Sequence, residues 1–158
     1  MAQLATRVDP TFASADEAVE GQARLRLITC RVEHDRGAVT RAMVECESAS
    51  CGVRTVGLQE GTTCPGGDLR LAALATLDAV IQATDGSLQI DLVGVKAMRA
   101  FDSTVVIVAA SVRRAGESTR VVGAAMADAD PLTATARATL QAVNRLVSPY
   151  LRPGLSIG

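Results

Sequence analysis

Each half of the chain contains three β-like stretches, the first of which, residues 24–29, alternates between polar and apolar residues, and a helical pattern follows each set of three. Alternation with a period of two is typical of β-strands that bury one face. The stretches are residues 24–29, 38–46 and 53–58 in the first half, and residues 88–95, 104–112 and 119–126 in the second. The order predicts a βββα unit that occurs twice.

Each predicted helix has a start signal and an apolar stripe. Asp130 precedes Pro131, as expected for an N-cap residue followed by proline at the first helical position. Apolar residues then recur every three or four positions, at Leu132, Ala136, Leu140, Val143 and Val147. After Asp68, the corresponding stripe is Leu69, Ala73, Leu77 and Val80. We expect both helices to pack on the strands through these stripes.

An internal repeat supports the two-unit interpretation. The sequence ATLDAV at 75–80 recurs as ATLQAV at 138–143, which sets an offset of 63 residues. At this offset Leu25, Leu27 and Val32 align with Leu88, Ile90 and Val95, and residues 42–44 align with 105–107. Residues 56–57 align with 122–123 only at an offset of 66. The predicted fold class is α+β: two pseudo-symmetric βββα units with helices packed on one face of antiparallel sheet.

The repeat also sets the expected domain organisation. Residues 23–84 and 87–151 form the two units of a single domain, residues 1–22 an N-terminal arm, and residues 152–158 a C-terminal tail. The 158 residues, 48% of them hydrophobic, suffice for one core.

Residues 105–110 are apolar at successive positions, so both faces of this predicted strand need cover. Helices on one face of the sheet leave its other face open. Because exposed apolar surfaces of that extent are uncommon on monomers, we expect a homodimer.

Composition and charge exclude several classes of partner. Sixteen basic and seventeen acidic residues leave a net charge of −1, which gives no basic surface for nucleic acid. The aromatic residues Phe12, Phe101 and Tyr150 are too few for base stacking. No secretory signal begins the sequence, and its apolar runs are too short to span a membrane. We expect a cytoplasmic protein with no nucleic-acid or membrane partner.

The four cysteines, Cys30, Cys46, Cys51 and Cys64, include no C-x-x-C pair. We expect them to be reduced and to pack as small hydrophobic residues. Two alternatives stay open: a mixed metal site of Cys46, Cys51 and His34, the only histidine, or a small enzyme that uses His34 with Cys30, Cys46 or a nearby carboxylate. No orienting third group is evident, so we expect no catalytic residue, metal or cofactor.

A run in the second half carries a family resemblance. Gly123 lies near the end of a predicted strand, Asp130 opens a helix, and the alanine-rich residues 134–143 lead into Asn144 and Arg145. This run resembles the end of the C-terminal regulatory domain of 2-isopropylmalate synthase and citramalate synthase. Domains of that family consist of two βββα units, pair between chains and bind a branched-chain effector at the paired interface. The resemblance covers residues 24 to about 150, and its specific motif occupies 123–146.

The resemblance implies a stand-alone, non-catalytic regulatory module that pairs as a homodimer, binds a small carboxylate or amino-acid effector and acts on a partner enzyme. By position, the effector site would include Gly123, Ala124, Ala125 and Asp130, with helix N–H groups suited to a carboxylate. The chain departs from the family pattern in two ways. Its 158 residues leave no room for the catalytic barrel of the synthases, and residues 97–102 stand where the family has a glycine-rich turn. A structural assembly protein without a ligand is the main alternative, in which Gly123 and Asp130 only support the fold.

Overall fold

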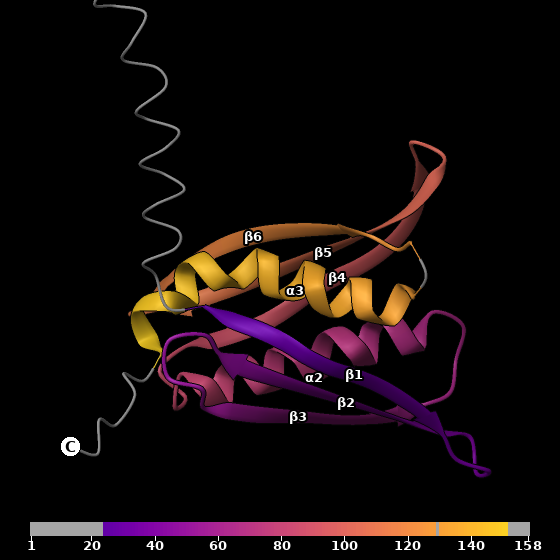
Figure 1. Ribbon diagram of the computed structural model, residues 1–158, viewed down its shortest axis with the longest axis horizontal. Helices are drawn as coiled ribbons and strands as arrows, with labels where there is room; N and C mark the ends of the chain where they lie inside the picture. The colour runs from indigo at the N-terminus through magenta and orange to yellow at the C-terminus, as the bar shows by residue number, and fades with distance from the viewer. Residues whose placement is uncertain (1–23, 129, 152–158) are drawn as a thin grey trace, which may run out of the picture.

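The computed structural model describes residues 24–128 and 130–151, which form two three-stranded antiparallel sheets and two long helices (Figure 1). The first unit consists of β1 (Leu25–His34), β2 (Val39–Ser48), β3 (Arg54–Thr62) and α2 (Gly67–Ala83). The second consists of β4 (Gln89–Ala100), β5 (Ser103–Arg114), β6 (Glu117–Met126) and α3 (Pro131–Val147), followed by the short 3-10 helix η2 (Ser148–Tyr150). The predicted βββα repeat is confirmed. The expected arm, 1–22, and tail, 152–158, lie outside the described residues.

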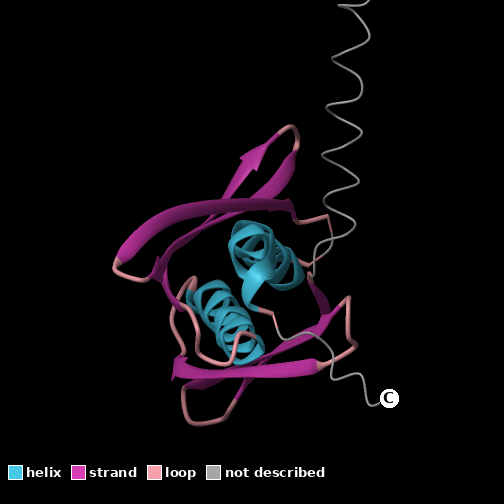
Figure 2. Ribbon diagram, turned by 90° about the vertical axis from the view of Figure 1, so that its left-hand side faces the viewer, coloured by secondary structure: helices cyan, strands magenta, loops and turns pink. Residues whose placement is uncertain are grey.

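The two helices lie side by side between the two sheets, which cover them from opposite sides (Figure 2). Each sheet therefore presents one face to the helix pair, and its other face points outward. Besides its own sheet, each helix contacts the first strand of the other unit: α3 packs against β1, and α2 against β4. The main core consequently contains residues of both units, among them Val44 and Val80 of the first and Val143 and Val147 of the second.

One glycine in each unit sets the closest approach of helix to sheet. A Cβ added to Gly57 on β3 would lie 1.8 Å from the carbonyl oxygen of Ala75 on α2. A Cβ added to Gly123 on β6 would lie 2.0 Å from the carbonyl oxygen of Ala138 on α3. Only glycine permits this approach, and the shared contact confirms the offsets of 66 in the third strand and 63 in the helix.

The offset expected for the first two strands is wrong. Val44 pairs with Gly57 in the first unit, and Val108 pairs with the equivalent glycine, Gly123, in the second. Val44 therefore corresponds to Val108 rather than to Ile107. Cys30 pairs with Val44 and Val95 with Val108, so Val95 matches Cys30 rather than Val32. The offsets are thus 64 in the second strand and 65 in the first. The strand pairing is irregular between Leu27 and Thr29 in the first unit and between Leu92 and Gly94 in the second. These irregularities lie at equivalent positions, so the offset of the first strand is the same on both sides of them.

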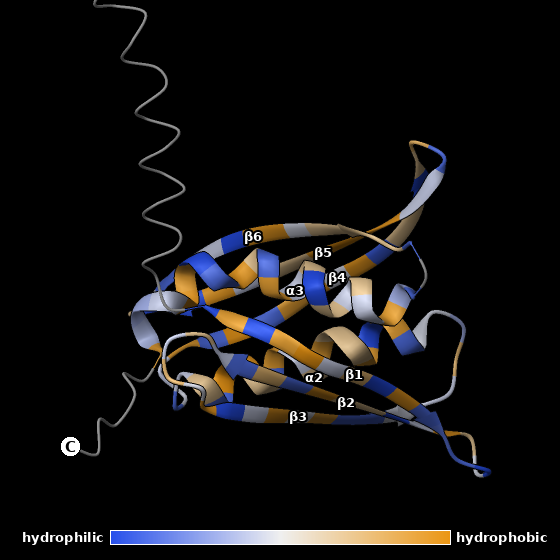
Figure 3. Ribbon diagram, in the orientation of Figure 1, coloured by the Kyte–Doolittle hydropathy of each residue, from blue (hydrophilic) through white to orange (hydrophobic). Residues whose placement is uncertain are grey.

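The outward faces of the two sheets differ in polarity. On the first sheet, ion pairs join Arg26 to Glu47 and Arg41 to Glu60 at 3.0 and 2.6 Å, and polar positions recur along its strands (Figure 3). On the second sheet, the register places Met98, Val105 and Met126 in one row across the strands, with Lys96, Ile107 and Ala124 in the next. Strand alternation buries Val106, Val108 and Ala110 against the helices. The remaining residues of the 105–110 run therefore face outward, as the sequence predicted.

Candidate functional site

Both helices begin at the same end of the molecule (Figure 1). A cavity of about 780 Å³ lies there, between their first turns. We call it the helix-start cavity. It is lined by His34, Thr63, Cys64, Pro65, Gly66, Asp68, Leu69, Ala97, Thr104, Asp130, Pro131 and Leu132. This volume falls within the range of small-molecule sites. The sequence analysis missed the cavity, because its walls come from both halves of the chain.

Asp130 lines this cavity and caps α3. Its carboxylate accepts hydrogen bonds from the backbone N–H groups of Leu132 and Thr133, at 3.0 and 3.3 Å, and from the Thr133 hydroxyl. The Thr133 hydroxyl, with the two amides, holds the pKa of the Asp130 carboxyl below its ordinary value. The N–H groups that were expected to bind a ligand carboxylate are therefore already occupied by Asp130.

The start of α2 is built differently. Its N-cap residue is Gly66, in the left-handed conformation with φ of 73°, and no side chain caps the helix. Among the described residues, the backbone N–H groups of Asp68 and Leu69 have no acceptor. Unpaired N–H groups at a helix N-terminus attract anions. The unpaired donors are thus at α2 rather than at α3, and Gly66–Gly67 ahead of Asp68 is the sequence feature that could have indicated them.

His34 joins the end of β1 to the start of α2. Its Nε2 lies 3.2 Å from Oδ2 of Asp68, and its Nδ1 lies 3.0 Å from the hydroxyl of Thr40. Thr40 in turn lies 2.7 Å from the hydroxyl of Thr63. Both ring nitrogens are therefore engaged, and the imidazole links three elements at the cavity wall. A carboxylate is thus within reach of His34, as the enzyme hypothesis required. The hydroxyl on the other ring nitrogen belongs to Thr40, which is buried.

The thiols named in that hypothesis are not paired with His34. The Sγ of Cys30 lies 3.7 Å from the carbonyl oxygen of Leu132, and Cys46 is fully buried. Burial, with a smaller contribution from Asp130, raises the pKa of Cys30 to about 11, and burial raises that of Cys46 to about 12. Both thiols stay protonated near neutral pH, which makes them poor nucleophiles.

The other predicted site residues lie away from the cavity. Gly123 packs against the backbone of α3, the backbone N–H of Ala124 donates to Oε1 of Gln141 at 2.7 Å, and Ala125 packs against the smaller core cluster of Val106 and Val108. Of the four residues that the resemblance placed at an effector site, only Asp130 lines the helix-start cavity.

Two further properties concern the described residues alone. Within 24–128 and 130–151, no group of three or more His, Cys, Asp or Glu side chains is arranged to hold a metal ion. In the same ranges, no helix has both the length and the apolar character needed to cross a membrane.

No protein-family model and no curated protein matches the chain. The resemblance to the synthase regulatory domain therefore depends on the sequence motif in residues 123–146.

Proposed function

We propose that the chain is a non-catalytic, dimeric binding module whose effector, a small carboxylate or amino acid, occupies the helix-start cavity. The observation that carries this proposal is the uncapped start of α2, where two backbone N–H groups face a cavity without an acceptor. A ligand carboxylate there gains hydrogen bonds and the favourable end of the helix dipole.

The remaining walls suit the rest of such a ligand. Leu69 and Leu132 contribute apolar surface from the two helices, and Ala97 closes the cavity from β4. The ionised carboxylate of Asp130, whose pKa is lowered, can accept a hydrogen bond from a ligand ammonium group. This combination favours an amino acid, or a 2-oxo acid that uses the carboxylate donors alone. In the regulatory role that the resemblance implies, such an effector controls a partner enzyme.

Thermal unfolding of the full chain tests the ligand. An effector present at 100 times its Kd adds about 2.7 kcal/mol, a rise of several degrees in Tm. The panel comprises the branched-chain amino acids and their 2-oxo acids. The variant Ala97→Phe fills the cavity and should abolish the shift, whereas Ala49→Phe, on an exposed hairpin, should retain it. A flat response of the wild-type protein would refute the effector and leave the assembly alternative.

The second sheet supplies a surface for the homodimer. Met98, Val122 and Met126 are 42%, 63% and 50% exposed on its outward face, beside Lys96. The other charged residues of this face, Asp91, Arg113 and Arg120, lie at its far end, where Asp91 and Arg113 pair at 2.9 Å. Two copies of this face can cover each other about a twofold axis, because an isologous contact needs only self-complementarity. On the first sheet, the ion pair Arg41–Glu60 occupies the place of Val105 and Met126, although Val56 and Leu58 are also exposed on that face.

Sedimentation of paired variants tests the dimer. Val122→Arg places a charge on the outward face of the second sheet, and Val56→Arg places one at the equivalent position of the first. We expect Val122→Arg to sediment as a monomer and Val56→Arg to remain dimeric. A monomeric wild-type protein, or equal disruption by the two variants, would contradict the pairing surface.

A further inference from the structure

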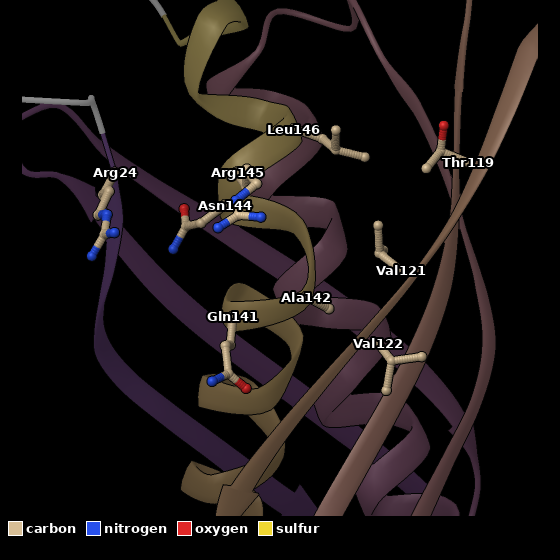
Figure 4. A pocket seen from close by; sticks show the side chains of 9 residues that line it. All are labelled: Arg24, Thr119, Val121, Val122, Gln141, Ala142, Asn144, Arg145 and Leu146. Atoms are coloured by element: carbon tan, nitrogen blue, oxygen red, sulfur yellow. The ribbon is translucent and has the colours of Figure 1, made fainter. Parts of the chain in front are cut away.

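We propose that a second hollow, at the opposite end of α3, is a separate binding site for a small organic anion. It has a volume of about 460 Å³ and lies between β6, the last turns of α3 and the start of β1 (Figure 4). We call it the α3 hollow. Its lining residues are Arg24, Thr119, Val121, Val122, Gln141, Ala142, Asn144, Arg145 and Leu146. None of them lines the helix-start cavity.

Apart from the hydroxyl of Thr119, which can donate or accept, the side-chain polar groups that remain free in the α3 hollow are hydrogen-bond donors. Arg24 and Arg145 bring two guanidinium groups from different elements, and neither forms an ion pair with any of the described residues. Gln141 uses its Oε1 to accept from Ala124, which leaves its amide N–H groups available. No Asp or Glu lines the hollow, and Glu117 on β6 lines a neighbouring one. Two cations without a carboxylate give the site a field that attracts anions.

The first unit shows that the fold itself does not need these charges. Gln82 of α2 occupies the position of Arg145, and its side-chain amide donates to the carbonyl oxygen of Val56 at 2.8 Å. At the corresponding place in the first unit, a smaller hollow of about 260 Å³ contains one arginine, Arg54. Arg54 is paired with Glu45 and Glu47 at 3.2 and 3.4 Å. A neutral amide thus suffices to pack the helix, and the unpaired guanidinium groups are particular to the second unit.

A structural role accounts for only part of the charge. Arg145 lies in the last turn of α3, where a cation complements the helix dipole. Arg24 precedes β1 and has no such role. The amide of Asn144 holds β1 beside α3, because it accepts from the Leu25 N–H and donates to the Leu25 carbonyl, both at 3.1 Å. This clamp fixes the residue next to Arg24 and so keeps both guanidinium groups at one hollow.

The walls indicate the class of ligand. Val121, Ala142 and Leu146 give the hollow an apolar surface between α3 and β6 (Figure 4). Guanidinium groups bind carboxylate and phosphoryl oxygens through paired hydrogen bonds. The ligand is therefore a small organic molecule whose oxyanion meets Arg24 and Arg145 and whose hydrocarbon part lies on this surface.

An NMR titration of the ¹⁵N-labelled full chain tests the site, with succinate and inorganic phosphate as separate probes at constant ionic strength. Saturable shifts at the Gln141 side-chain amide and at the backbone amides of Val122 and Ala124 are expected. Binding of succinate identifies a carboxylate site, and binding of phosphate alone identifies a phosphoryl site. No saturable change with either probe overturns the proposal.

Matched variants localise the binding. Arg145→Gln introduces the residue that the first unit carries, and Arg24→Gln introduces the residue found at the equivalent position 89; each should weaken binding about tenfold or more. Arg26→Gln, which removes an arginine paired with Glu47, should bind like the wild-type protein. Ala97→Phe, which fills the helix-start cavity, should also bind like the wild-type protein, because Ala97 does not line the α3 hollow. Unchanged binding in both Arg24→Gln and Arg145→Gln, or an equal loss in Arg26→Gln, would refute the site.

Discussion

Gly57 and Gly123 bring each helix close to its sheet because they have no side chain. A methyl group at Gly57 would lie 1.8 Å from one α2 backbone atom and 2.7 Å from another, so the helix must move. We expect Gly57→Ala or Gly123→Ala to lower the free energy of unfolding by about 3 kcal/mol or more, the upper range for overpacked cores. Urea denaturation measures the loss.

Gly94→Ala is the matched control for these variants. Gly94 also lies on a strand, but nothing lies within 4 Å of an added Cβ, so this change should cost much less. If Gly57→Ala and Gly94→Ala were equally stable, the close approach of helix to sheet would not be a requirement of the fold.

Asp130 stabilises the start of α3 through two backbone N–H groups. Asp130→Ala should therefore cost about 1 kcal/mol at pH 7, while Asp130→Asn should retain most of the cap. Because the folded state lowers the pKa of this carboxyl, its contribution is present above the unfolded pKa of about 3.9 and disappears as the pH falls through the lower folded value. Urea denaturation at pH 7 and pH 3 measures both effects, and an Asp130→Ala deficit that persists unchanged at pH 3 would contradict this account.

At the scale of elements, local signals predicted both helices and all six strands, because strand alternation and helix caps depend on neighbouring residues. The predicted residue-by-residue alignment of the two units was less accurate than the prediction of the elements. A period-two pattern still fits after a shift of two residues, so Leu25 aligned with Leu88 although its structural counterpart is Ile90. A single-residue slip in the second strand matched the core residue Val44 with the outward-facing Ile107. The offset changes in the connections between the strands, whereas the strand irregularities lie at equivalent places in the two units and leave it unchanged.

The candidate sites were harder to predict, because their walls combine residues that are far apart in the sequence. Asp130 was recognised from the Asp-Pro start of α3, yet its cavity also needs Asp68 and His34 from the first unit. Arg24 and Arg145 lie at opposite ends of the described chain, and no sequence pattern links them. Only the packing of β1 against α3 brings these two to one hollow.

Asn144 connects the two units at the level of elements, because it bonds to both backbone groups of Leu25. Asn144→Ala leaves these groups without protein partners, and we expect a loss of roughly 1–3 kcal/mol in the free energy of unfolding. Amide exchange at Leu25 should accelerate more than exchange at Val44 in the middle of β2. Asn144→Asp keeps the acceptor and loses the donor, so it should fall between wild type and Asn144→Ala. Uniform acceleration along both strands would argue against a local clamp.

For the whole molecule, the position of the helices between two sheets makes the units depend on each other. Leu25 and Val80 of the first unit share one core cluster with Ile90 and Val143 of the second. Neither unit can bury both faces of its helix alone, so we expect a single cooperative unfolding transition. Amides on β2 and β5 should lose protection at the same urea concentration, and Gly123→Ala should lower that concentration for β2 as much as for β5. Two separate transitions would instead mean that each βββα unit is stable by itself.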